Sequence, residues 1–104
     1  MLFHVTMTHT EDNCAVYRPE MMPGIFQAYE NLEALGKELN VTLHYFTWCA
    51  PDHVAFVLLE ADSLSAASRY LFSIPMRQKI TFVPVEHLHD TLAMARAARA
   101  QAER

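Results

Sequence analysis

Two histidines and two cysteines stand in two pairs along this 104-residue chain. Four residues separate His9 from Cys14, and three separate Cys49 from His53 in the stretch FTWCAPDHVAF. This pattern, H-x4-C…C-x3-H, resembles the spacing of Cys2His2 metal sites, in which each short segment supplies two ligands. Thiolate and imidazole together favour Zn²⁺, copper or nickel over magnesium or calcium. The pattern therefore predicts a transition-metal site formed by His9, Cys14, Cys49 and His53.

A second set of residues, His4, His44 and Glu60, can also do chemistry. Two imidazoles and a carboxylate can hold a metal as a 2-His-1-carboxylate set. They can also act as acid and base, because a glutamate desolvated among aromatic side chains has a raised pKa that suits proton transfer near neutrality. This set predicts a cofactor-independent monooxygenase or isomerase acting on a small apolar substrate, as the alternative to a metal-binding accessory protein.

Structural roles compete with both interpretations. A cysteine is often buried as a small hydrophobic side chain, and a histidine that closes a strand is usually a half-exposed hydrogen-bonding group. Glu60 can simply help to solvate a dimer interface just before a helix begins. A Cys14–Cys49 disulfide is a lesser alternative. The third function class is a purely structural dimerisation module.

The composition is that of one small globular domain, since 52% of the residues are hydrophobic and only two are glycine. The net charge of -4 and the isoelectric point near 5.8 give no general attraction to nucleic acid. The longest strictly apolar run, Val54 to Leu59, is far too short to span a bilayer. No basic residue precedes Arg18, so we expect no signal peptide, a cytoplasmic location and reduced thiols.

Hydrophobic periodicity and turn residues predict four strands and three helices. The strands are expected over Leu2 to His9, Val41 to Trp48, Val54 to Glu60 and Lys79 to Val85. The helices are expected from Pro23-Gly24 to Asn40, from Asp62-Ser63 to the residue before Pro75, and from His87 to the terminus. The methionines Met21 and Met22, just before the first helix, can line a pocket mouth or fill an irregular gap.

The order β-α-β-β-α-β with a tail helix is the split βαβ arrangement of ferredoxin-like folds. Right-handed crossovers give an α+β domain with a four-stranded antiparallel sheet, strand order 4-1-3-2, and two helices on one face. We expect residues 1–86 to form this α/β-barrel domain and residues 87–104 to form its helical tail. Large side chains would lie on the other face: Leu2, Phe46, Trp48, Val54, Phe56 and Leu58. An uncovered apolar face of this size predicts a homodimer packed sheet to sheet.

This layout, and in particular the stretch VAFVLLEADSLSAASRYL, resembles the dimeric α/β-barrel superfamily, which includes antibiotic-biosynthesis monooxygenases and muconolactone isomerase. One small family of that group, known to bind nickel, has a similar ending, with a Trp-containing hairpin, a strand ending in Glu-Ala, a helix and a Gly/Ile-Pro step, here Ile74-Pro75. The resemblance covers roughly Val41 to Val85. It implies a homodimer with a metal site, or a pocket for a small-molecule ligand, between sheet and helices or between sheets. It implies no particular reaction, because members of the superfamily do unrelated chemistry.

Chain direction brings the first set of residues together. His9 ends the first strand and His53 begins the third, and these strands are neighbours about 4.8 Å apart. Cys49 ends the second strand at the same edge of the sheet, and Cys14 follows in the loop. Side-chain alternation predicts that His9, Cys49 and His53 all face the helices, where they converge.

The same alternation places the second set on the face without helices. Antiparallel pairing predicts that His4 and Glu60 are cross-strand neighbours. His44 would then lie diagonal to Glu60 at about 7–8 Å, within reach of long side chains.

Overall fold

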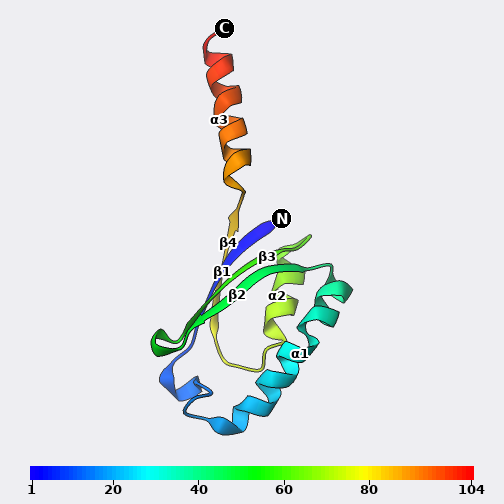
Figure 1. The fold of residues 1–104 in the computed structure, drawn as a ribbon, viewed down its shortest axis with the longest axis vertical. Helices are drawn as coiled ribbons and strands as arrows, with labels where there is room; N and C mark the ends of the chain where they lie inside the picture. Colours follow the sequence, from blue (N-terminus) through cyan, green and yellow to red (C-terminus); the bar gives the residue numbers. More distant parts are fainter.

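A computed structural model describes residues 1–104, and its four strands form one sheet (Figure 1). The strands are β1 (Leu2–Thr8), β2 (Thr42–Cys49), β3 (Val54–Glu60) and β4 (Lys79–Val85). The helices are α1 (Met22–Leu39), α2 (Leu64–Phe72) and α3 (Leu88–Ala102), with short 3-10 turns at Glu11–Asn13, Pro19–Met21 and Ala50–Asp52. The sheet order β2-β3-β1-β4 is the predicted order read from the other edge. All neighbouring strands are antiparallel, which confirms the predicted topology.

Helices α1 and α2 cover one face of the sheet, and the hydrophobic core lies between the two layers (Figure 1). Alternate side chains of β1 and β3 point into this core, which is why Val5 and Val57 are fully buried. Leu32 of α1 and Leu71 of α2 pack into the same cluster at the predicted helical spacing. The buried alternate set fixes the strand register, because a slip of one residue would turn every side chain to the opposite face.

Local signals set the ends of the two packed helices. Ser63 caps α2, because its hydroxyl accepts a hydrogen bond from the backbone N–H of Ala66 at 3.1 Å. Helix α1 ends at Asn40, whose left-handed backbone (φ 55°, ψ 46°) turns the chain toward β2. The Gly36 carbonyl accepts a hydrogen bond from the Val41 N–H at 2.7 Å. A Cβ at Gly36 would lie 2.9 Å from the Val41 carbonyl oxygen, so this turn requires glycine.

Replacing Gly36 with alanine is expected to destabilise the protein by about 1–2 kcal/mol. Overpacking typically costs about 1–3 kcal/mol, and the better helix propensity of alanine offsets up to about 1 kcal/mol. The clash is with backbone, which cannot rotate away. Urea unfolding followed by circular dichroism measures the change. Gly24→Ala is the control, because a Cβ there meets only the Pro75 side chain at 3.3 Å; equal stabilities of the two variants would contradict the clash.

Strand β2 contains a β-bulge at His44. Its pairing with β3 shifts by one residue between Leu43 and Tyr45, which leaves His44 as an extra residue in the ladder. Beyond the bulge, Phe46 and Trp48 pair with buried residues of β3 and therefore face the helices. The prediction that Phe46 and Trp48 lie on the open face is wrong, because uninterrupted alternation was assumed through His44.

The opposite face of the sheet carries no helix (Figure 1). The predicted residues Leu2, Val54, Phe56 and Leu58 do lie on this open face. Four of its large side chains remain 37–48% exposed: Tyr45, Phe56, Val83 and Val85. A solvated apolar sheet face of this kind is typical of an interaction surface.

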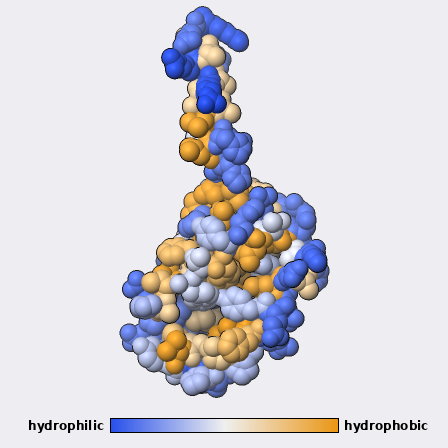
Figure 2. Space-filling model, viewed as in Figure 1, coloured by the Kyte–Doolittle hydropathy of each residue, from blue (hydrophilic) through white to orange (hydrophobic).

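The predicted third helix is present, and α3 projects away from the rest of the molecule (Figure 1). None of its residues is buried, and the molecule measures 65 × 31 × 18 Å. Leu88, Leu92 and Met94, in the first half of α3, are exposed. Hydrophobic colour lies along the part of this helix nearest the body, and its tip is mainly hydrophilic (Figure 2). No helix in the structure combines the length and the apolar character needed to cross a membrane.

Candidate metal centre

Three of the predicted ligands meet at one edge of the sheet. One donor atom each from His9, Cys14 and His53 can be chosen so that all three lie within 4.8 Å of one another. His9 follows the last residue of β1, and His53 precedes the first residue of β3. The backbone N–H of His9 donates to the carbonyl of His53 at 3.2 Å, so the antiparallel ladder itself holds these two residues side by side. Their predicted convergence is confirmed.

Cys14 reaches the two histidines because the chain folds back after β1. The 3-10 turn Glu11–Asn13 reverses its direction, and the Cys14 N–H donates to the Glu11 carbonyl at 3.1 Å. The Asn13 side chain supports the turn by donating to the Thr10 hydroxyl at 3.0 Å. Cys14 is only 5% exposed, so its thiol faces the interior. A buried thiol beside two imidazoles is a suitable soft donor for a metal.

His53 occupies a backbone conformation that most side chains avoid. Its φ of 53° and ψ of 42° lie in the left-handed region, where glycine is least strained. Such positions cluster at functional sites, where the surrounding structure holds the residue in place. The turn at Ala50–Asp52 thus places a histidine at a position where glycine would have less backbone strain.

The two imidazoles face each other closely. His53 Nδ1 lies 3.3 Å from His9 Nε2, and the ring planes are 77° apart. Burial, and then repulsion from the neighbouring His53, lower the pKa of His9 below its ordinary value of 6.5. His9 Nδ1 is buried without any hydrogen-bond partner. These features favour a neutral His9 imidazole, which is the form that binds a metal.

Cys49 lies outside the cluster. It pairs with Val54 on the open face, because the bulge at His44 inverts the alternation of the second half of β2. Its thiol donates instead to a carboxylate oxygen of Asp52 at 3.5 Å. The prediction that Cys49 faces the helices with His9 and His53 is wrong. Both cysteines are free, so no disulfide joins Cys14 to Cys49 in this structure.

The second predicted set comes together only in part. His44 Nε2 lies 2.9 Å from Glu60 Oε1, a hydrogen bond on the open face at the bulge in β2. Glu60 is directly opposite Leu2 in the ladder and His4 is opposite Leu58, so the predicted neighbours His4 and Glu60 are diagonal and not directly paired. The His4 ring instead lies 6.4 Å from that of Tyr45. His44 and Glu60 form a pair, and His4 lies diagonal to it.

Comparison with known proteins informs the fold. No protein-family model and no curated protein matches the chain. The solved structure of SCO4226 from Streptomyces coelicolor A3(2) matches 84% of this chain and 100% of its own, with a TM-score of 0.55 and 17% identity. A dimeric ferredoxin-like protein from an uncultured marine organism matches 83% of this chain and 95% of its own, with a TM-score of 0.37 and 16% identity. The chain has the ferredoxin-like fold.

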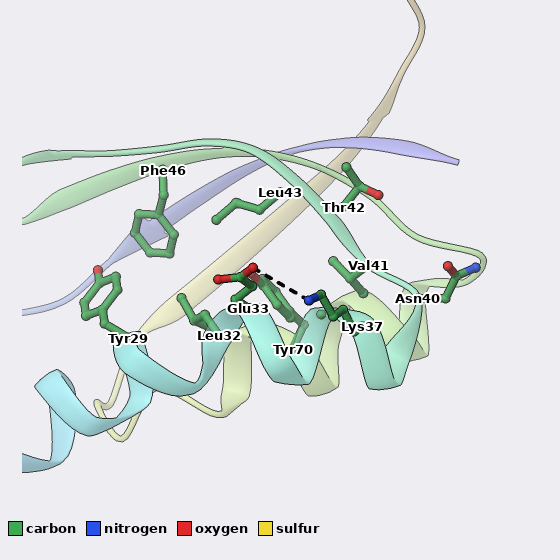
Figure 3. A pocket seen from close by; sticks show the side chains of 11 residues that line it. Tyr29, Leu32, Glu33, Lys37, Asn40, Val41, Thr42, Leu43, Phe46 and Tyr70 are labelled. Carbon is green, nitrogen blue, oxygen red and sulfur yellow. Dashed lines mark ion pairs between the residues drawn. The ribbon is translucent and has the colours of Figure 1, made fainter.

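This ferredoxin-like domain also contains a cavity of about 700 Å³ between α1 and β2 (Figure 3). Leu32, Phe46 and Tyr70 line it, and an exposed ion pair between Glu33 and Lys37, with 3.8 Å between the charged atoms, lies beside it (Figure 3). Burial raises the pKa of Tyr70, so its hydroxyl remains protonated at neutral pH. None of the predicted site residues lines this cavity.

Sequence reasoning missed one contact beside the cluster of His9, Cys14 and His53. Trp48 Nε1 donates to the Tyr29 hydroxyl at 2.5 Å, and the Trp48 ring lies 6.2 Å from that of His9. Burial raises the pKa of Tyr29, and the hydrogen bond from Trp48 lowers it by less. The contact was missed because the bulge that turns Trp48 toward α1 has no clear sequence signal.

Proposed function

We propose that this protein binds one transition-metal ion, Zn²⁺, copper or nickel, through His9, Cys14 and His53. The observation that carries the proposal is the convergence of two imidazoles and a buried thiol within 4.8 Å. Without a metal, His53 Nδ1 and His9 Nε2 share a hydrogen bond at 3.3 Å, so the two imidazoles are already held close enough to act as ligands of one ion. Soft sulfur with two borderline nitrogens suits these three metals better than magnesium or calcium.

Metal binding would depend on the protonation states of Cys14 and His9. The Cys14 thiol must lose its proton on binding, and the lowered pKa of His9 means that little proton release is needed there. Elemental analysis of untagged protein purified without added metal tests the proposal. About one metal ion per chain supports it. Absence of metal from such protein, together with no uptake during dialysis against Zn²⁺, Cu⁺ or Ni²⁺, contradicts it.

Replacing His53 with glycine is expected to have opposite effects on stability and on metal binding. The metal-free protein should gain up to about 1 kcal/mol, because glycine has no steric penalty in the left-handed region. Affinity for Zn²⁺ should fall by about a hundredfold or more, because one of three donors is lost. Chemical unfolding in the presence of a chelator measures the first effect, and competition with a chromophoric chelator measures the second.

Asn40→Gly is the matched control, because Asn40 is the only other non-glycine residue with a positive φ. It lies at the end of α1 and has no part in the metal cluster. Its zinc affinity should equal that of the wild type. A His53→Gly variant that keeps full zinc affinity would remove His53 from the site.

The proposed assembly is a homodimer packed through the open face of the sheet. The exposed side chains of Tyr45, Phe56 and Val83 support it, because large apolar side chains gathered on one exposed face often mark an interaction site. Sedimentation velocity tests this directly, with Phe56→Glu as the disrupting variant. A monomeric wild-type protein at micromolar concentration contradicts the proposal.

A second candidate function is acid–base catalysis on a small apolar substrate at the open face. The observation that favours it is the 2.9 Å hydrogen bond between His44 and Glu60, with His4 nearby among aromatic rings. The test is turnover of small aromatic substrates in the presence of oxygen. Activity that is lost in Glu60→Gln and retained in Cys14→Ser supports a monooxygenase or isomerase, and activity that depends on Cys14 assigns catalysis to the metal cluster.

A further inference from the structure

A second, smaller cavity lies directly beside the metal cluster. It has a volume of about 220 Å³, lies between the loop after Cys14, the start of α1 and the end of β2, and opens to solvent beside the exposed side chains of Val16 and Phe26. Every residue that lines it, apart from His9, is hydrophobic. We call this cavity the apolar chamber, and Met22, Ile25, Trp48 and Met76 form much of its wall.

Apart from His9, whose Nδ1 has no hydrogen-bond partner, the chamber wall offers almost no free polar atoms. The indole N–H of Trp48 is already bonded to the Tyr29 hydroxyl at 2.5 Å. Water in the chamber would therefore find few hydrogen-bond partners, whereas an ordered buried water typically makes about three hydrogen bonds. Such a cavity favours an apolar occupant. Phe26 at its margin is 57% exposed, so the chamber has an apolar rim as well.

Two of the three proposed metal ligands, His9 and Cys14, belong to the wall of this chamber. A metal held by three protein donors keeps a coordination position for a fourth ligand, as in catalytic zinc sites. Because His9 and Cys14 border the chamber, a molecule inside it can reach a metal that they hold. The metal and the apolar surface would then act together on one ligand.

We propose that the apolar chamber binds a small apolar molecule, about the size of one aromatic ring, whose single soft donor atom, a thiol sulfur, completes the coordination of the metal. The inference rests on the proposed metal-binding function. The volume fits this class, because an apolar cavity of about 150 Å³ is enough to hold benzene. Thiols match the softness of a site that already contains Cys14.

Cobalt substitution provides the test, because the visible absorption of Co²⁺ reports its ligands and geometry. Phenylmethanethiol and 2-mercaptoethanol are titrated into the Co²⁺-loaded protein. Both are alkyl thiols of similar acidity, and only the first carries a ring. Phenylmethanethiol is expected to bind at least about tenfold more tightly than 2-mercaptoethanol. Burial of its ring in the chamber adds to the bond that both sulfurs make to Co²⁺.

Two substitutions test the contribution of the chamber without changing a metal ligand. Val16→Trp and Ala50→Leu enlarge side chains that line the chamber, and Val16 and Ala50 are both exposed enough to change without loss of the core. Each is expected to remove the tenfold preference and to leave Co²⁺ affinity unchanged. Glu30→Trp, on the exposed side of α1, is the control and should keep the preference.

The possible outcomes distinguish this inference from the function on which it rests. Failure to bind any of Zn²⁺, Cu⁺, Ni²⁺ and Co²⁺ overturns both proposals. Tight Co²⁺ binding with a spectrum that neither thiol changes overturns only the chamber ligand. A thiol response that appears only in the double variant Met22→Leu/Met76→Leu also overturns it, because a methionine sulfur would then be the fourth donor. Equal affinities for the two thiols show that the chamber contributes nothing and likewise contradict the inference.

Discussion

Replacing Cys14 with serine is expected to lower the affinity of the protein for Zn²⁺ by about a hundredfold or more. Loss of outer-shell partners alone costs about 10–100-fold in metal affinity, and Cys14 would be a direct ligand. A serine hydroxyl is a harder donor that remains protonated near neutral pH, so it cannot replace the thiolate. Competition with a chromophoric chelator at pH 7 measures the change.

Cys49→Ser is the matched control, because it makes the same chemical change in the only other cysteine. Cys49 lies on the opposite face of the sheet beside Asp52, so zinc affinity should not change. Cys14→Ala provides a second variant, because a buried serine can destabilise the fold and an alanine avoids a buried hydroxyl. Equal losses in Cys14→Ser and Cys49→Ser would contradict the site derived from the structure. Thermal unfolding of each metal-free variant separates loss of a ligand from loss of the fold.

The histidine half of this site could be predicted because it depends only on topology. His9 lies just after β1 and His53 just before β3, and these two antiparallel strands are neighbours in the sheet. The strand order follows from the order of the elements and the right-handed crossover rule. Such reasoning needs no knowledge of side-chain detail. It succeeds for His9 and His53 because β1 and β3 pair without a bulge, so the alternation along both strands is regular.

Cys49 could not be placed correctly because its position depends on counting residues along a strand. Each inserted residue inverts the alternation that follows it, and the bulge at His44 adds one residue between the helix and Cys49. The stretch TLHYFTWC has aromatic residues at both parities, so its hydrophobic pattern does not reveal which of them face the core. The exposed position of α3 could not be predicted for a different reason, because a weakly amphipathic, alanine-rich helix does not specify a packing partner.

The bulge leads to the second prediction of large effect, which compares two single-residue deletions in β2. Deleting Thr47 should destabilise the protein by about 2–3 kcal/mol, because either Phe46 or Trp48 must then turn from the helices to the open face. Deleting His44 should cost less than about 1 kcal/mol, even though it lies in the same strand, because it removes the extra residue and restores regular alternation.

The same comparison tests how the bulge relates to the two candidate sites. Loss of His44 also removes its hydrogen bond to Glu60, while Trp48 stays against Tyr29 and beside His9. The His44 deletion should therefore keep its zinc affinity, and the Thr47 deletion should lose part of it as Trp48 leaves the His9 ring. Urea unfolding and chelator competition on both variants provide the measurements. A His44 deletion as unstable as the Thr47 deletion would mean that the bulge itself stabilises the sheet, and that its role is not confined to presenting His44 on the open face.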